Sequence, residues 1–296
     1  MKKLSLLFTL ISFCVFSQEK KFITPDLPKN QVYQYHISSA SSLKSPKGKS
    51  YHAPFTVNQD VELTYLFNDG NDKIFSWKII NYEHLHEGKK EEKNDCNCNK
   101  VAYRNQLTVY FRTDSLGAYK KINNLAQVRG NLLKNIAEQE KLLSKNDKNI
   151  FERVKRNPEG VISNIEEDII IFSRYFGLEN KNSVNTLFAR RNNFPFGLKS
   201  KPFKVVLSVL SEEKDLKINV KNEFDKHKAE DEDYNIFRFK QNVEKEKKHY
   251  QLIADEEYVF SKENFRLLSA KLTAKEISNF HNDGIYDYQY SITQKE

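Results

Sequence analysis

Two histidines and two cysteines, His84, His86, Cys96 and Cys98, are the side chains whose types and spacing most suggest chemistry. If residues 82–87 continue a β-strand, the histidines share one face of it, and two imidazoles with two thiolates can bind zinc or copper. In an oxidising compartment Cys96 and Cys98 can instead form a disulfide, or remain free or intermolecular thiols. Because His-x-His, nine residues and Cys-x-Cys is not a common zinc framework, the sequence leaves these alternatives open.

The fingerprints of common enzymes are absent from the sequence. Gly48-Lys49-Ser50 resembles the end of a phosphate-binding loop, but Leu43 stands where that loop needs its first glycine. No Gly-x-Ser-x-Gly, His-Glu-x-x-His or Gly-x-Gly-x-x-Gly motif occurs. Glu166-Glu167-Asp168 lies beside an apolar helical stripe, and we interpret it as the solvated face of that helix. We therefore expect no catalytic residue and no cofactor-binding residue, although a pair of carboxylates brought together by the fold stays an alternative.

The first eighteen residues have the chemistry of a secretory signal peptide. Lys2 and Lys3 precede an apolar run from Leu4 to Phe16, which is too short for a permanent membrane span. We expect cleavage after Gln18, and the ending Phe-Ser-Gln resembles signal peptides of the Bacteroidota. Bulky Phe13 stands where a lipoprotein signal needs a small residue before its cysteine, so we expect no lipidation of Cys14. The sequence thus predicts a periplasmic or secreted protein.

The composition of residues 19–296 favours a single soluble β-rich domain. These residues contain 46 basic and 40 acidic side chains spread along the chain, which gives no reason to expect nucleic acid as a partner. No second apolar run reaches membrane-spanning length. The chain has 21 phenylalanines and 15 tyrosines but one tryptophan, and aromatic residues of this kind suit pleated sheets. No Pro/Gly/Ser linker separates the chain into two units.

Alternating apolar and polar residues predict strands in two parts of the chain, 31–123 and 203–293. The clearest alternation runs from Val57 to Phe67, and Asn68-Asp69-Gly70 is typical of a hairpin turn after it. In the last predicted strand, Tyr286, Tyr288 and Tyr290 form one aromatic face. The other predicted strands are near 31–38, 73–82, 106–113, 203–210, 215–221, 234–242, 249–258 and 264–274. A short strand through Ile122 is also predicted after the turn Asp114-Ser115-Leu116-Gly117.

Between the two β parts, residues 124–177 have helical periodicity. The clearest helix begins after Asn157, with Pro158 in its first turn, and ends before Gly177. Ile165, Ile169 and Phe172 recur on its apolar stripe, so we expect it to pack on the sheet. We interpret residues 178–202 as an ordered loop. The predicted fold is α+β and mainly antiparallel, with about eleven strands in a large curved sheet or open barrel or sandwich, and two or three central helices packed on it.

This order of elements resembles that of secreted Bacteroidota proteins with two β parts around a helical part, and that of the open β-barrels of periplasmic lipoprotein carriers. The resemblance covers most of residues 19–296 and rests on element order rather than on a motif. In those carriers helices cap an incomplete barrel with an apolar lining, so the resemblance implies an apolar groove. We expect a non-catalytic binding protein whose partner is an apolar ligand such as a lipid, or an envelope protein. The alternatives are an enzyme acting on an envelope glycan or cell-wall polymer, and a structural protein whose sheet edge recruits a partner strand.

Overall fold

The computed structural model describes residues 22–44, 50–86, 102–141, 149–191, 201–224, 250–278 and 284–295. Within these residues three helices and eleven strands occur. The first β part contains β1 (Val32–Lys44), β2 (Ser50–Asp69), β3 (Asp72–His86), β4 (Thr108–Thr113) and β5 (Tyr119–Ile122). The helices are α2 (Leu125–Glu140), α3 (Asn149–Arg156) and α4 (Pro158–Ser173). The second β part contains β6 (Ser183–Arg191), β7 (Lys201–Ser211), β8 (Asp215–Phe224), β9 (Tyr250–Ser261), β10 (Leu267–Ser278) and β11 (Gly284–Gln294).

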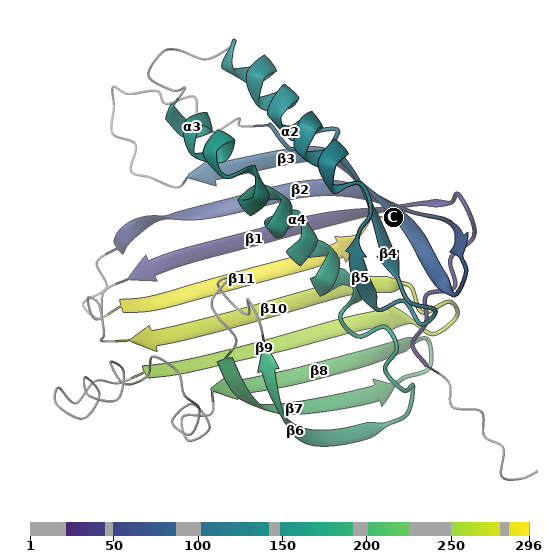
Figure 1. Cartoon of the computed structure of the whole chain (residues 1–296). Coiled ribbons are helices and arrows are strands. Elements are labelled where there is room, and N and C mark those ends of the chain that lie inside the picture. Colours follow the sequence, from purple (N-terminus) through teal and green to yellow (C-terminus); the bar gives the residue numbers. More distant parts are fainter. Residues whose placement is uncertain are drawn as a thin grey trace, which may run out of the picture.

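All eleven strands belong to one open antiparallel sheet with the order β5-β4-β3-β2-β1-β11-β10-β9-β8-β7-β6. The first and last of the described strands, β1 and β11, therefore pair in the middle of the sheet, where Tyr35 lies opposite Gln294 and Leu43 opposite Tyr286. Figure 1 shows the three helices on one face of this sheet, with α4 crossing the central strands. The predicted α+β, mainly antiparallel fold is confirmed.

Local sequence accounts for the hairpins that join neighbouring strands. Gly70 turns β2 into β3 with a φ of 62°, and Gly117 turns β4 into β5 with a φ of 98°, values that glycine adopts without strain. The Asp114 carboxylate accepts hydrogen bonds from the backbone N–H groups of Leu116 and Ala118, both at 2.9 Å. The residues of these two turns thus favour the hairpins β2–β3 and β4–β5.

The helix α4 packs its apolar stripe against the inner face of the sheet. Asn157 caps its first turn by accepting a hydrogen bond from the N–H of Gly160 at 3.3 Å. Ile165 and Ile169 are fully buried. The Phe172 ring meets Trp77 of β3 edge-on at 5.6 Å and Tyr35 of β1 at 5.3 Å. The prediction that α4 is part of the core is confirmed.

A buried ion pair fastens the end of α4 to the second half of the sheet. Glu256 on β9 has a fully buried side chain, and its Oε2 lies 2.7 Å from Nη1 of Arg174. The same carboxylate accepts hydrogen bonds from the Tyr175 hydroxyl at 3.1 Å and from Nδ2 of Asn222, on β8, at 3.0 Å. Four polar groups from three segments therefore meet under the helix.

One predicted boundary is wrong. Residues 178–202 were expected to be a loop, but they contain β6, which pairs with β7 from Ser183↔Val209 to Arg191↔Lys201. Val184 is 71% exposed and Leu187 is 41% exposed, so this edge strand lacks the buried face whose alternation reveals a strand in sequence. The predicted strand at 234–242 lies outside the described residues.

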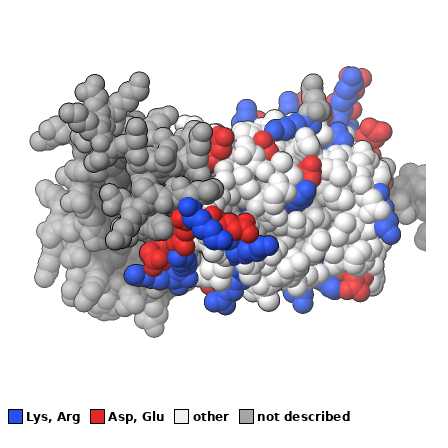
Figure 2. All heavy atoms as spheres, turned by 90° about the horizontal axis from the view of Figure 1, so that it is seen from above, with Lys and Arg blue, Asp and Glu red and all other residues white. Residues whose placement is uncertain are grey.

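The charges on the described surface are mixed. On the face seen in Figure 2, basic and acidic side chains of the described residues are interspersed and form no single-sign patch. None of the helices in the described ranges has both the length and the apolar character needed to cross a membrane.

Candidate functional site

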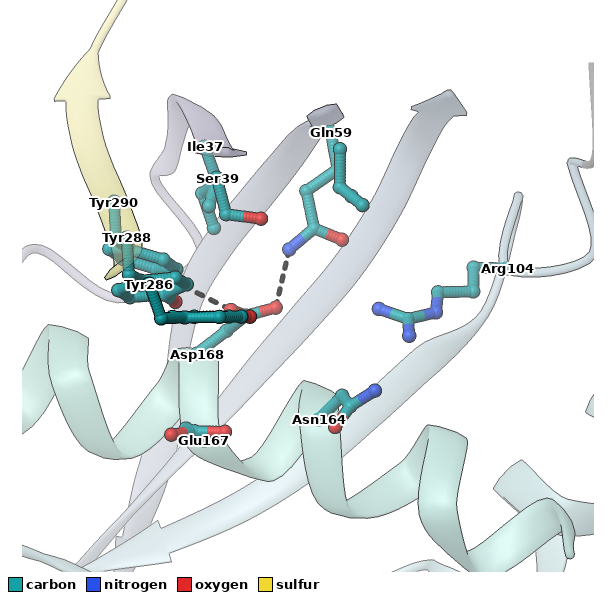
Figure 3. A pocket seen from close by; sticks show the side chains of 11 residues that line it. Ile37, Ser39, Gln59, Arg104, Asn164, Glu167, Asp168, Tyr286, Tyr288 and Tyr290 are labelled. Carbon is teal, nitrogen blue, oxygen red and sulfur yellow. Dashed lines mark hydrogen bonds between the residues drawn. The ribbon is translucent and has the colours of Figure 1, made fainter. Parts of the chain in front are cut away.

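A pocket of about 320 Å³ lies between α4 and the middle of the sheet. Its lining comes from β1, β2, β11, α4 and the turn before β4, and consists of Ile37, Ser39, Val57, Gln59, Arg104, Asn164, Glu167, Asp168, Tyr286, Tyr288 and Tyr290. Asn164 is exposed, so the pocket reaches the surface there. Figure 3 shows these side chains around the pocket.

Strand register brings the sheet side of the pocket together. Ser39 on β1 lies opposite Val57 on β2 and opposite Tyr290 on β11, and Ile37 lies opposite Gln59. Because alternate residues of a strand point to the same face, these side chains share the face that α4 covers. The pocket floor is thus built by pairing between the two ends of the chain.

Asp168 is the centre of the polar part of the pocket. It is buried on α4, and its Oδ1 accepts a hydrogen bond of 2.8 Å from the Tyr290 hydroxyl. Its Oδ2 accepts a hydrogen bond from Nε2 of Gln59 (Figure 3). Burial raises the pKa of Asp168, and Arg104 and the two hydrogen-bond donors oppose that rise. Since both oxygens are engaged by the protein, Asp168 holds the helix to β2 and β11 and is poorly placed to act as a base.

Arg104 reaches the pocket from a turn that two elements hold in place. Nδ2 of Asn135, on α2, donates to the carbonyl oxygens of Tyr103 and Asn105 at 3.1 and 2.9 Å. The Arg104 guanidinium lies 4.6 Å from the centre of the Tyr82 ring, a cation–π distance. In Figure 3 it points across the pocket towards Asp168, and the charges of the two groups attract each other. The guanidinium of Arg104 therefore lines the pocket while it lies over the Tyr82 ring.

Tyr286, Tyr288 and Tyr290 form an aromatic wall on β11. The rings of Tyr288 and Tyr290 are nearly parallel, with centres 6.5 Å apart. Burial, together with Glu167, raises the pKa of Tyr288 well above the usual value for a phenol, and burial with Asp168 does the same for Tyr290. Both phenols therefore stay protonated and can donate hydrogen bonds.

Glu167 precedes Asp168 on α4 and lies beside this wall. Burial and the neighbouring Asp168 raise the pKa of Glu167 to about 7, and Arg174 opposes that rise. The expectation that Glu166, Glu167 and Asp168 form a solvated helix face is wrong for Asp168, which is 9% exposed. Asp168 lies three residues after Ile165 and four before Phe172, so it falls within the buried stripe.

The predicted metal set is only partly within the described residues. His84 and His86 lie at the end of β3, where the backbone of His84 pairs with Val57 and that of His86 with Phe55. Cys96 and Cys98 lie outside the described residues. Within the described ranges no group of three or more His, Cys, Asp or Glu side chains could hold a metal ion. Metal binding, with zinc or copper as the ion, stays a prediction, and so does the disulfide.

Sequence reasoning found one wall of the pocket and missed the rest. The alternation of Tyr286, Tyr288 and Tyr290 predicted the aromatic wall. Gln59 and Asp168 were missed, although Gln59 stands between inward-facing Val57 and Val61, and Asp168 has helical spacing from Ile165 and Phe172. No sequence signal marks Arg104, because its position depends on a turn held by another element.

Comparison with known proteins supports the fold. No family model matches the sequence, and no curated protein matches it. A solved structure of lipovitellin, described in terms of its lipid–protein interactions, matches with a TM-score of 0.50 and 12% identity over 91% of this chain and 25% of that chain. This chain thus spans about a quarter of the length of lipovitellin. DynF, from the dynemicin biosynthesis pathway of Micromonospora chersina, matches at a TM-score of 0.20 and 7% identity over 94% of this chain and 86% of that chain, which is too low to bear on the fold.

Proposed function

We propose that the protein is an exported, non-catalytic binding protein that accepts an amphipathic, lipid-like ligand in the pocket between α4 and the sheet. The observation that carries the proposal is the pocket itself, which joins an aromatic wall and the apolar side chains of Ile37 and Val57 to a buried polar end at Gln59 and Arg104. Such a lining suits a ligand with one apolar and one polar part. The signal-like first eighteen residues support export.

The size of the pocket limits what it can hold. Ligand pockets usually measure about 300–1,000 Å³, and this one, at about 320 Å³, is at the lower end. It suits a headgroup with the adjoining part of one chain rather than a whole two-chain lipid. The similarity to the fold of lipovitellin, whose structure was described for its lipid–protein interactions, is consistent with a lipid-like ligand.

Native mass spectrometry of the protein purified from its own envelope tests the proposal. We expect an amphiphile to be retained by the wild type and lost from Ser39→Trp, because the indole fills the pocket. Ser38→Trp is the matched control: Ser38 is the adjacent residue, and its hydroxyl donates to Asn58 instead of lining the pocket. Retention of the same ligand by Ser39→Trp, or turnover of an envelope glycan by the wild type, would contradict the proposal.

A second candidate function is recruitment of a partner strand by β6. It is favoured by the exposure of Val184 and Leu187 on an edge strand whose paired neighbour among the described strands is β7. Under this function Val184→Lys would abolish capture of an envelope protein and leave ligand content unchanged. If the protein instead binds a lipid-like ligand, Val184→Lys would change neither the capture of an envelope protein nor the ligand content.

A further inference from the structure

Two buried polar atoms at the pocket have no hydrogen-bond partner among the residues that the structure describes. One is Nε of Arg104, a donor, and the other is Oε1 of Gln59, an acceptor. The two side chains are only 6% and 2% exposed, and both line the pocket (Figure 3). An unpaired buried polar group destabilises the folded protein, because it has lost its hydrogen bonds to water. A ligand anion would supply an acceptor for Nε of Arg104, and the polarised C–H groups of an alkylammonium can approach Oε1 of Gln59.

The charges around the pocket are separated by sign. Glu167 and Asp168 lie on α4 beside the tyrosines of β11, and among the described residues Arg174 acts on Glu167 and Arg104 acts on Asp168 through their charges without a direct ion pair. Tyrosine rings next to carboxylates attract organic cations through the negative faces of the rings. Arg104 enters from the turn before β4, and its guanidinium is suited to phosphate or carboxylate. One end of the pocket thus favours a cation and the other an anion.

We infer that the ligand has a zwitterionic headgroup, with its ammonium group against Glu167, Asp168 and the tyrosine wall and its phosphate or carboxylate against Arg104. This inference rests on the proposed function, because it assigns the headgroup of the ligand that the pocket is proposed to hold. An anionic fatty acid would pair its carboxylate with Arg104 but would leave Glu167 and Asp168 without a cation. A simple cationic amphiphile would leave Arg104 without its partner.

Isothermal titration calorimetry with four amphiphiles that share a dodecyl chain tests the inference. The probes are dodecylphosphocholine, dodecyl phosphate, dodecyltrimethylammonium and dodecyl maltoside, each added to the purified protein below its critical micelle concentration. We expect dodecylphosphocholine to bind at least about tenfold more tightly than each of the others, which corresponds to about 1.4 kcal/mol. Equal affinity for all four would overturn the zwitterion and leave a lipid-binding function standing. Binding of none of them would overturn both.

Two variants assign the two ends of the headgroup. Arg104→Met should remove the preference over dodecyltrimethylammonium, because the phosphate loses its partner. Glu167→Gln should reduce the preference over dodecyl phosphate, because the ammonium loses one carboxylate. Glu166→Gln is the matched control on α4, since Glu166 accepts from the Tyr119 hydroxyl and does not line the pocket. If Arg104→Met does not fold, Glu167→Gln still tests the position of the ammonium group. An unchanged preference of Glu167→Gln for dodecylphosphocholine over dodecyl phosphate would contradict the assignment.

One further probe separates a lipid from a soluble zwitterion. Phosphocholine without its chain should bind at least about tenfold more weakly than dodecylphosphocholine if the pocket also holds part of the chain. Equal affinity would keep the zwitterionic assignment and overturn the lipid-like ligand.

Discussion

Breaking the ion pair between Arg174 and Glu256 should undock α4 from the second half of the sheet. Arg174→Met removes the arginine that contacts the fully buried carboxylate of Glu256, and Glu256→Gln removes the charge that faces Arg174, whose side chain is 15% exposed. Removing one partner of a buried ion pair destabilises a protein by about 3–5 kcal/mol. Because Tyr175 and Asn222 still donate to Glu256, we expect the lower end of that range, about 3 kcal/mol, for Arg174→Met.

The double variant separates the pair from its surroundings. With both charges gone, neither position leaves its former partner's charge buried alone, so Arg174→Met/Glu256→Gln should be more stable than the sum of the single losses implies. We expect a coupling energy at the upper end of the about 0.5–3 kcal/mol range for residues in contact. Arg129→Met serves as control, since Arg129 and Glu159 form a pair in which both side chains are more than half exposed. Arg129→Met should lower the free energy of unfolding by less than about 1 kcal/mol.

Urea denaturation followed by fluorescence measures these losses. Trp77 is the one tryptophan of the chain, and its contact with Phe172 makes its emission sensitive to the docking of α4. With a urea slope of about 3 kcal/mol per molar, a loss of 3 kcal/mol moves the midpoint by about 1 M. An Arg174→Met variant with the urea midpoint of the wild type would refute the role assigned to this pair. So would a double variant whose loss of stability equals the sum of the two single losses.

Three other perturbations have defined outcomes. Ile169→Asp should bury an unpaired charge in the fully buried stripe of α4 and lower stability by several kcal/mol, enough to unfold a marginally stable domain; unchanged thermal melting would mean that the helix is peripheral. The pKa of Glu167 is about 7 in the folded protein and about 4.3 when unfolded, so its contribution to stability is complete below about pH 4 and is lost as the pH rises through 7. The wild type should therefore lose more stability than Glu167→Gln between pH 5 and pH 8, by about 1–2 kcal/mol after discounting for partial exposure, and parallel urea midpoints for the two proteins would contradict this. Reduced protein should take up about one zinc or copper ion, and His84→Ala and Cys96→Ser should each weaken that uptake; absence of stoichiometric metal by elemental analysis would leave the disulfide or free thiols.

Much of the local structure could be predicted from the sequence because its causes are local. The period of two in Tyr286, Tyr288 and Tyr290 predicts a strand with an aromatic face, and β11 has it. Asn157 and Pro158 predict the start of α4. Gly70 predicts the turn between β2 and β3, where its positive φ is found. Each of these features depends on backbone geometry within a few residues, so the local sequence is sufficient to predict it.

Tertiary structure alone decided which strands pair across the middle of the sheet and which polar side chains become buried. No local pattern pairs β1 with β11, because that pairing joins the two ends of the chain through contacts that form only when the sheet assembles. The acidic residues next to Asp168 suggest a solvent-exposed side chain. The packing of α4 buries it instead, and Gln59 and Tyr290 donate hydrogen bonds to its carboxylate. Arg104 reaches the pocket because Asn135 holds its turn. A polar residue is buried when distant elements supply its partners, and the sequence around that residue does not contain them.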